Sequence, residues 1–174
     1  MKSKKILIVP LVLVSLTVFT FSGCSKPAEK PADTTTDDTK TENVESMPNP
    51  VVERTSSEEV SAAIGFTFES LPADITDVKY STISNNLAQV TFTSNGVNYT
   101  ARKADPNIDN VSGVYTAFKN GETRTTASGT AVIFQSNDDG MGLATWKTDN
   151  FIYSVYCESG FDAAAMEAIV NSIS

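Results

Sequence analysis

The dipeptide Asn95-Gly96, set between two runs of alternating apolar and polar residues, constrains the fold of this chain more than any other feature. Asn-Gly is the strongest two-residue signal for a β-hairpin, because both central residues of such a turn need a positive φ. A hairpin centred there places Phe92 opposite Tyr99 and Val90 opposite Ala101. The apolar residues then share one face, and a shift of one residue would reverse them. The sequence therefore predicts two antiparallel strands with one buried face.

A second antiparallel hairpin is predicted from residues 141–147 and 151–158, with Asp149-Asn150 as its two-residue loop. This register sets Trp146 opposite Tyr153, an aromatic pair that suits a sheet face covered by a helix. The other pairs that it predicts are Ala144 with Val155 and Gly142 with Cys157.

The alternation of this last strand places Cys157 on the same face as Tyr153 and Val155. A free cysteine on a covered face behaves as a small hydrophobe, so we expect a buried structural thiol rather than a nucleophile. Glu158 is the nearest charge in the sequence, and we expect it to raise the pKa of the thiol.

Two helices are predicted, one near each end of the folded part. Ser56 and Glu59 form a capping box ahead of a helix over residues 57–64, and Gly65 is a natural stop. Asp162 can cap the last helix. Its apolar residues recur at helical spacing: Met166, Ile169, Val170 and Ile173.

The remaining pattern predicts further short strands separated by turns. The additional strand candidates are residues 66–68, 78–83, 114–118 and 130–135, the turns are 119–122 and 137–140, and the loop is 104–113. The expected fold is α+β: a mostly antiparallel sheet of about six to eight strands, packed by a short N-terminal helix and an amphipathic C-terminal helix.

The N-terminus has a basic start and an uncharged apolar run over residues 6–21, which is typical of a secretory signal. It ends in Phe21-Ser22-Gly23-Cys24, which resembles the lipobox of bacterial lipoproteins, although Leu is usual where Phe21 stands. The resemblance implies that residues 1–23 are removed and that Cys24 carries lipid, including palmitate, at the extracytoplasmic face of the cell membrane. An uncleaved signal anchor and a plain secreted protein are the alternatives.

Residues 24–50 follow as a predicted tether that is rich in Pro, Thr and acidic side chains. Such a composition buries too little apolar surface to offset the entropy of ordering, so we expect disorder there. Residues 51–174 are long enough for a single α+β domain and too short for two.

Composition excludes several classes of function. Removal of residues 1–23 would leave 10 basic and 21 acidic residues, a formal net charge of −11, which disfavours nucleic-acid partners. The chain has no histidine, so Ser-His-Asp and Cys-His nucleophile systems are absent. It has two cysteines, and a lipid on Cys24 would leave Cys157 without an intramolecular partner.

The folded part also resembles a domain of unknown function that occurs in small lipoproteins of Gram-positive bacteria and at the extracytoplasmic ends of some anti-sigma factors. The resemblance covers most of residues 57–173. It rests on Gly65-Phe66, Leu71-Pro72, Trp146 ahead of Tyr153-Ser154, and the stretches 99–104 and 109–113. It implies a location and a fold, and it brings no catalytic residues to this sequence.

Three groups of residues are candidates for a site, each with a plainer interpretation. Asp138-Asp139-Gly140, and Asp105 with Asn107 and Asp109, would suit a hard cation, but turn chemistry also explains them. Arg102 and Lys103 beside Tyr99 would suit an anion, or else a solvated strand edge. Trp146 and Tyr153 would stack on a sugar or peptide, or else form a core pair.

These observations predict a non-enzymatic, membrane-anchored lipoprotein that binds an extracellular protein or a small ligand. We expect no cofactor, no metal ion and no nucleic acid among its partners. The alternative is an envelope-sensing regulatory or inhibitory domain that acts with a transmembrane partner. A hydrolase that uses carboxylates alone is a third hypothesis, but no pair of carboxylates has a sequence reason to share a cleft.

Overall fold

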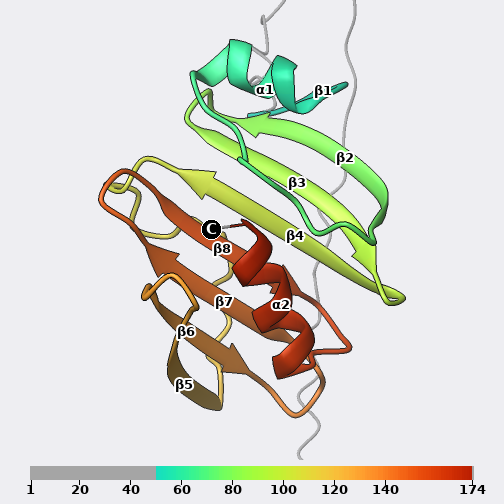
Figure 1. The fold of residues 1–174 in the computed structure, drawn as a ribbon, viewed down its shortest axis with the longest axis vertical. Coiled ribbons are helices and arrows are strands. Elements are labelled where there is room, and N and C mark those ends of the chain that lie inside the picture. The colour runs from blue at the N-terminus through green and yellow to red at the C-terminus, as the bar shows by residue number, and fades with distance from the viewer. Residues whose placement is uncertain (1–49, 174) are drawn as a thin grey trace, which may run out of the picture. The chain divides into compact units, whose positions relative to one another are not determined.

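The computed structural model describes residues 50–173, all of which belong to the compact unit Glu45–Ser174. They form one antiparallel sheet of eight strands and two helices, which confirms the predicted α+β class (Figure 1). The strands are β1 (Val51–Arg54), β2 (Thr76–Ile83), β3 (Leu87–Ser94), β4 (Val97–Ala104), β5 (Asn120–Thr125), β6 (Ala131–Ser136), β7 (Gly142–Lys147) and β8 (Ile152–Cys157). The helices are α1 (Ser57–Ile64) and α2 (Ala163–Ile173).

The sheet consists of two meanders of four strands each, which meet where β4 pairs with β8. Its order is β1-β2-β3-β4-β8-β7-β6-β5, so β1 and β5 are the two outer strands (Figure 1). Residues 105–119 connect β4 with the far edge at β5. Val111 in this connection is buried against Leu87 and Ala104.

Both predicted hairpins have the predicted register. Asn95 and Gly96 have φ values of 51° and 78°, as their turn requires, and Phe92 pairs with Tyr99. In the second hairpin Trp146 pairs with Tyr153. The other predicted partners also face one another: Val90 and Ala101, Ala144 and Val155, Gly142 and Cys157.

The main core lies between one face of the sheet and the helices, and we call this face the helix face. The four apolar residues predicted for α2 are all buried in it: Met166, Ile169, Val170 and Ile173. Asp162 Oδ1 accepts a hydrogen bond of 2.8 Å from the Ala165 N–H, which confirms the predicted cap. Leu87 and Ala104 alternate with helix-face residues, so the Val111 cluster lies on the opposite side, which we call the second face.

Helix α1 begins and ends where the sequence predicts. Ser56 Oγ accepts from the Glu59 N–H at 3.4 Å, and Gly65 ends the helix with φ 85°. The return bond of the capping box differs by one residue, because Glu59 Oε2 accepts from Thr55 N at 2.8 Å. This backbone hydrogen bond from Thr55 is the main reason that the pKa of Glu59 is lowered.

Several sequence predictions about short strands are wrong. Residues 66–68 and 114–118 form no strand, and Phe66 instead packs its ring on the core as part of an irregular segment. The predicted turn at 119–122 lies largely within β5, and β1 precedes α1 where no strand was expected. Both missed strands are sheet edges with mostly exposed side chains, so backbone pairing forms them without apolar alternation.

The predicted signal peptide, the lipid site Cys24 and all of the predicted tether except Pro50 lie outside the described residues. Those assignments therefore stay predictions. Among residues 50–173, no helix has both the length and the apolar character needed to cross a membrane.

Candidate functional site

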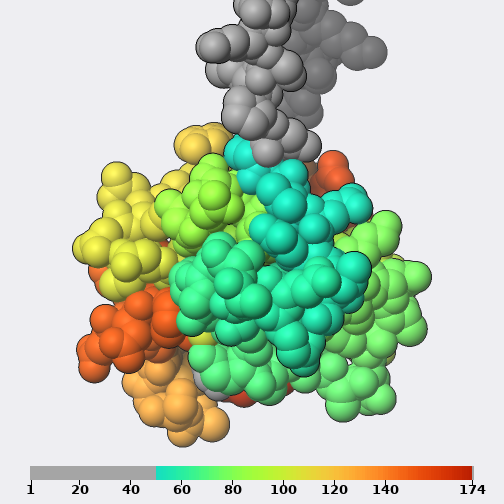
Figure 2. Space-filling model, turned by 90° about the horizontal axis from the view of Figure 1, so that it is seen from above, coloured from blue at the N-terminus to red at the C-terminus, as the bar shows by residue number. Residues whose placement is uncertain are grey.

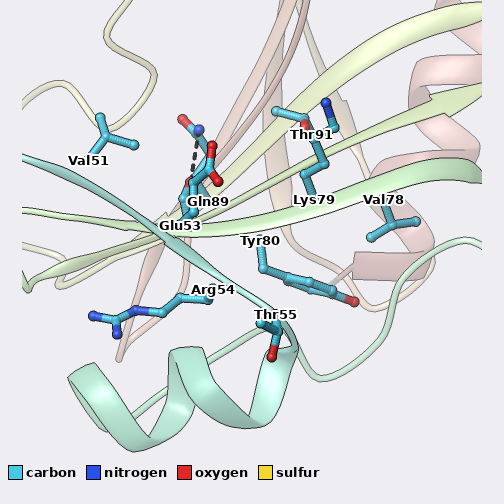
Figure 3. Close-up of a pocket in the computed structure, with 10 residues that line it drawn as sticks. Val51, Glu53, Arg54, Thr55, Val78, Lys79, Tyr80, Gln89 and Thr91 are labelled. Atoms are coloured by element: carbon cyan, nitrogen blue, oxygen red, sulfur yellow. Dashed lines mark hydrogen bonds between the residues drawn. The ribbon is translucent and has the colours of Figure 1, made fainter.

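A groove of about 430 Å³ lies at the sheet edge where β1 ends, and we call it the edge groove (Figure 3). β1 pairs with β2 only as far as Tyr80, whereas β2 itself begins at Thr76. The outer edge of β2 from Thr76 to Lys79 therefore has no strand partner within residues 50–173. The groove is lined by Val51, Glu53, Arg54, Thr55, Val78, Lys79, Tyr80, Ser81, Gln89 and Thr91.

A β-bulge shapes one end of this groove. The register between β2 and β3 shifts between Thr76 and Lys79, and Asp77 in the bulge has φ 53°. Thr76 Oγ1 donates to Asp77 Oδ2 at 3.1 Å. Bulges redirect side chains at sheet edges, and here Val78 is left 37% exposed at the groove. A non-glycine residue with a positive φ is a local strain that often accompanies a functional surface.

The groove contains charges that are not paired with one another. Neither Glu53 nor Lys79 forms an ion pair with any described residue. Arg54 also lacks an ion pair there and donates through Nε and Nη2 to Thr82 Oγ1, at 3.3 and 3.2 Å. A carboxylate and two cations thus remain free to meet complementary groups of a ligand.

A chain of neutral hydrogen bonds forms the polar side of the groove. Gln89 Nε2 donates to Ser81 Oγ at 3.1 Å, as the dashed line in Figure 3 shows. Gln89 Oε1 accepts from Arg102 Nε at 2.8 Å. The amide of Gln89 is thereby held with both ends engaged, which fixes this wall of the groove.

Arg102 holds the connection between β4 and β5 in place and does not form an anion site. Its Nη1 donates to Ser112 O at 2.7 Å and to Val111 O at 3.4 Å, which fastens residues 105–119 to the second face. Burial lowers the pKa of Arg102. Gly113 has φ 66° and lies so close that a Cβ there would overlap Nη1 of Arg102. The predicted solvated strand edge is wrong, because β4 lies in the middle of the sheet.

Lys103 lies on the helix face and its side chain is only 1% exposed. Nζ donates to Thr67 O at 2.8 Å and forms an ion pair with Glu69. It also lies 4.1 Å from the centre of the Phe151 ring. The predicted solvated strand edge is wrong for Lys103 as well, because β4 lies in the middle of the sheet, and its buried ammonium meets the Glu69 carboxylate rather than an external anion.

Trp146 and Tyr153 form a core pair, so their plainer interpretation is confirmed. Their ring centres are 5.0 Å apart and the planes differ by 2°, and both side chains are buried. Burial and, to a smaller extent, the Glu69 carboxylate raise the pKa of Tyr153 to about 12. No sugar or peptide reaches these rings in this conformation.

The acidic turns are explained by hydrogen bonds within the chain. Asp105 Oδ1 accepts from the Asn107 N–H at 2.9 Å, and Asp139 Oδ1 accepts from the Met141 N–H at 3.0 Å. Asp138 pairs with Lys119 at 2.7 Å. Within the described part of the chain, no group of three acidic or cysteine side chains is placed to hold a metal ion.

Cys157 is fully buried on the helix face, as predicted. The pKa of its thiol is raised to about 11. The cause differs from the prediction, because burial raises this pKa and Glu158 makes no contribution. A backbone hydrogen bond involving Gly142 lowers the pKa by a smaller amount.

The edge groove was not predicted from the sequence. It depends on the unpredicted strand β1 and on a bulge whose left-handed residue, Asp77, carries no glycine signal. The one available clue was the β-branched pair Val51-Val52 directly before the helix cap.

No family model, no curated protein and no solved structure matches this chain. The resemblance to the domain of unknown function therefore stays a prediction.

Proposed function

We propose that this protein is a lipoprotein anchored through Cys24 at the extracytoplasmic face of the membrane, whose folded part is a non-enzymatic binding domain. Its edge groove receives an extended segment of another extracytoplasmic protein. The observation that carries this proposal is the outer edge of β2 over residues 76–79, which has no strand partner in the described part of the chain and borders the groove.

An unpaired strand edge offers a row of backbone donors and acceptors to an added strand. The surface around it is also unusually apolar for this domain. Among residues 50–173, three of the five exposed large hydrophobic residues belong to β1 and β2: Val51, Val52 and Val78. In the space-filling view the cyan segment that contains β1 and α1 lies at the surface beside the green of β2 (Figure 2).

The groove does not present a nucleophile with an activating base. Its most enclosed hydroxyl, Ser81 Oγ, accepts a hydrogen bond from the amide of Gln89, and the chain contains no histidine. A serine without an adjacent base is a weak nucleophile. Binding is therefore the activity that these side chains support.

The proposal is tested by photo-crosslinking on living cells. A photoreactive residue at Thr55, an exposed groove position, should give one discrete protein adduct, and the same residue at the exposed Thr123 of β5 should not. Val78→Asp should reduce the Thr55 adduct by about fivefold or more, since a charge would enter an apolar contact.

The matched control is Ile133→Asp, which places the same charge on an apolar strand residue that is 50% exposed and outside the groove. Equal adducts from Thr55 and Thr123, or an adduct that Val78→Asp leaves unchanged, would contradict the proposal. A transmembrane regulator as the captured protein would favour the envelope-sensing alternative.

A further inference from the structure

The segment between α1 and β2, residues 65–75, crosses the helix face without forming a helix or a strand, and we call it the strap. Phe68 of the strap is buried in the main core, and three further contacts fasten the segment. The Phe66 ring lies 5.1 Å from the Phe151 ring, and Ser70 Oγ donates to Ser172 O of α2. The third fastening is the ion pair of Glu69 with Lys103.

The two side chains of this ion pair differ in how deeply they are buried. The Lys103 side chain is 1% exposed, whereas that of Glu69 is 62% exposed. The remaining neighbours of the ammonium group are the carbonyl oxygen of Thr67 and the rings of Phe151 and Tyr153. Both oxygens that compensate the buried charge therefore come from the strap. A buried cation is costly without its partner, so the Lys103 charge holds the strap down.

Two buried polar atoms in this region, Thr67 Oγ1 and Trp146 Nε1, have no hydrogen-bond partner among the described residues. Trp146 stacks on Tyr153, which in turn lies 5.4 Å from Lys103 Nζ. The unsatisfied hydroxyl of Thr67 lowers the stability of the closed strap, so the ionic contact of Glu69 contributes more of what holds it closed.

We propose that the strap is a releasable cover, latched over Lys103 and the aromatic rings by the single carboxylate of Glu69. Loss of that negative charge opens residues 65–75 while the sheet stays folded. Tyr80 lines both the edge groove and a smaller pocket bordered by Glu69 and Ser70. Opening of the strap therefore uncovers one side of Tyr80, a residue that lines the groove, and this last consequence alone rests on the proposed function.

Limited proteolysis of the full chain, followed by mass spectrometry, tests the latch without any partner. Glu69→Gln keeps the shape of the side chain and removes its charge, and the exposed position lets the variant fold. We expect cleavage within residues 66–71 to become about tenfold faster, while cleavage within β3 and β4 stays slow.

Trp146 is the only tryptophan in the chain, so its fluorescence reports on the same region. Quenching by acrylamide should increase in Glu69→Gln. The control is Glu122→Gln, which also neutralises a half-exposed carboxylate in an ion pair, with Arg124 on β5. An unchanged rate of cleavage in the strap, or equal acceleration of cleavage throughout the sheet, would overturn the proposal. Failure of the crosslinking experiment would leave these two measurements unaffected.

Discussion

At the scale of single residues, the buried side chains of β8 make the stability of the domain sensitive to alkaline pH. The pKa of Cys157 is raised from 9.0 to about 11, and that of Tyr153 from 10.0 to about 12, chiefly by burial. Both groups are neutral in the folded and unfolded states below pH 9. As pH rises above 9, the unfolded chain loses these protons first, so the stability present at lower pH is lost by about pH 12.

Cys157→Ala should isolate the contribution of the thiol to this loss. At pH 7 the variant should be less stable by about 1–2 kcal/mol, within the usual range for a core truncation. Between pH 9 and 11 it should lose less stability than the parent protein, because the ionisation of the thiol no longer favours unfolding. Urea unfolding at pH 7 and at about pH 10 measures both effects, and parallel losses in the two proteins would contradict the assignment.

Native thiol labelling gives a second check on the same residue. Cys157 is completely covered, so labelling should be slow until denaturant is added, in a chain whose Cys24 has been replaced. Rapid labelling of the native protein would mean that the helix face of β8 is accessible.

At the scale of elements, the connection from β4 to β5 depends on one side chain. Arg102→Leu should remove the donors to Ser112 O and Val111 O and cost about 2–3 kcal/mol, since the carbonyl groups would stay covered without partners. Lys147→Leu is the control, because its exposed ammonium also donates to this connection, at Pro106 O over 2.7 Å. Its loss should cost well under 1 kcal/mol, and equal costs for the two variants in urea unfolding would refute the role of Arg102.

The elements also show what the sequence could predict. The two hairpins and both helices were predictable because their signals are local: a turn dipeptide, a cap residue and an apolar stripe. β5 was missed because an outer strand needs only one neighbour, and its Asn120-Gly121 pair resembles a turn. The burial of Lys103 was missed because it depends on where β4 lies in the sheet, and strand order depends on contacts between distant residues.

The edge groove and the strap were likewise not predictable from local sequence signals. The groove exists because β1 is four residues shorter than β2, and the length of an edge strand leaves little trace in composition. The strap carries Phe66 and Phe68, whose spacing resembles a strand, yet both rings pack on the main core and the segment pairs with no strand of residues 50–173.

At the scale of the whole molecule, the proposed anchor determines where the binding surface can act. Cys24→Ser should leave the precursor unprocessed or release the folded part to the medium, because no acyl chain would be attached. Palmitate labelling with membrane fractionation measures this. Ser22→Ala is a suitable control, since it keeps a small residue before the cysteine, and normal labelling of the Cys24→Ser protein would remove the basis of the anchor.

The seam between the two meanders determines the order in which the chain can complete its fold during synthesis. Thr100 of β4 pairs with Tyr156 of β8, and 56 positions separate them, whereas the strands within each meander lie close in sequence. A ribosome that has produced only the first meander leaves the inner edge of β4 bare until nearly the whole chain is made. A chain that ends between β4 and β8 therefore exposes this edge to other polypeptides, which makes such incomplete translation products prone to aggregation.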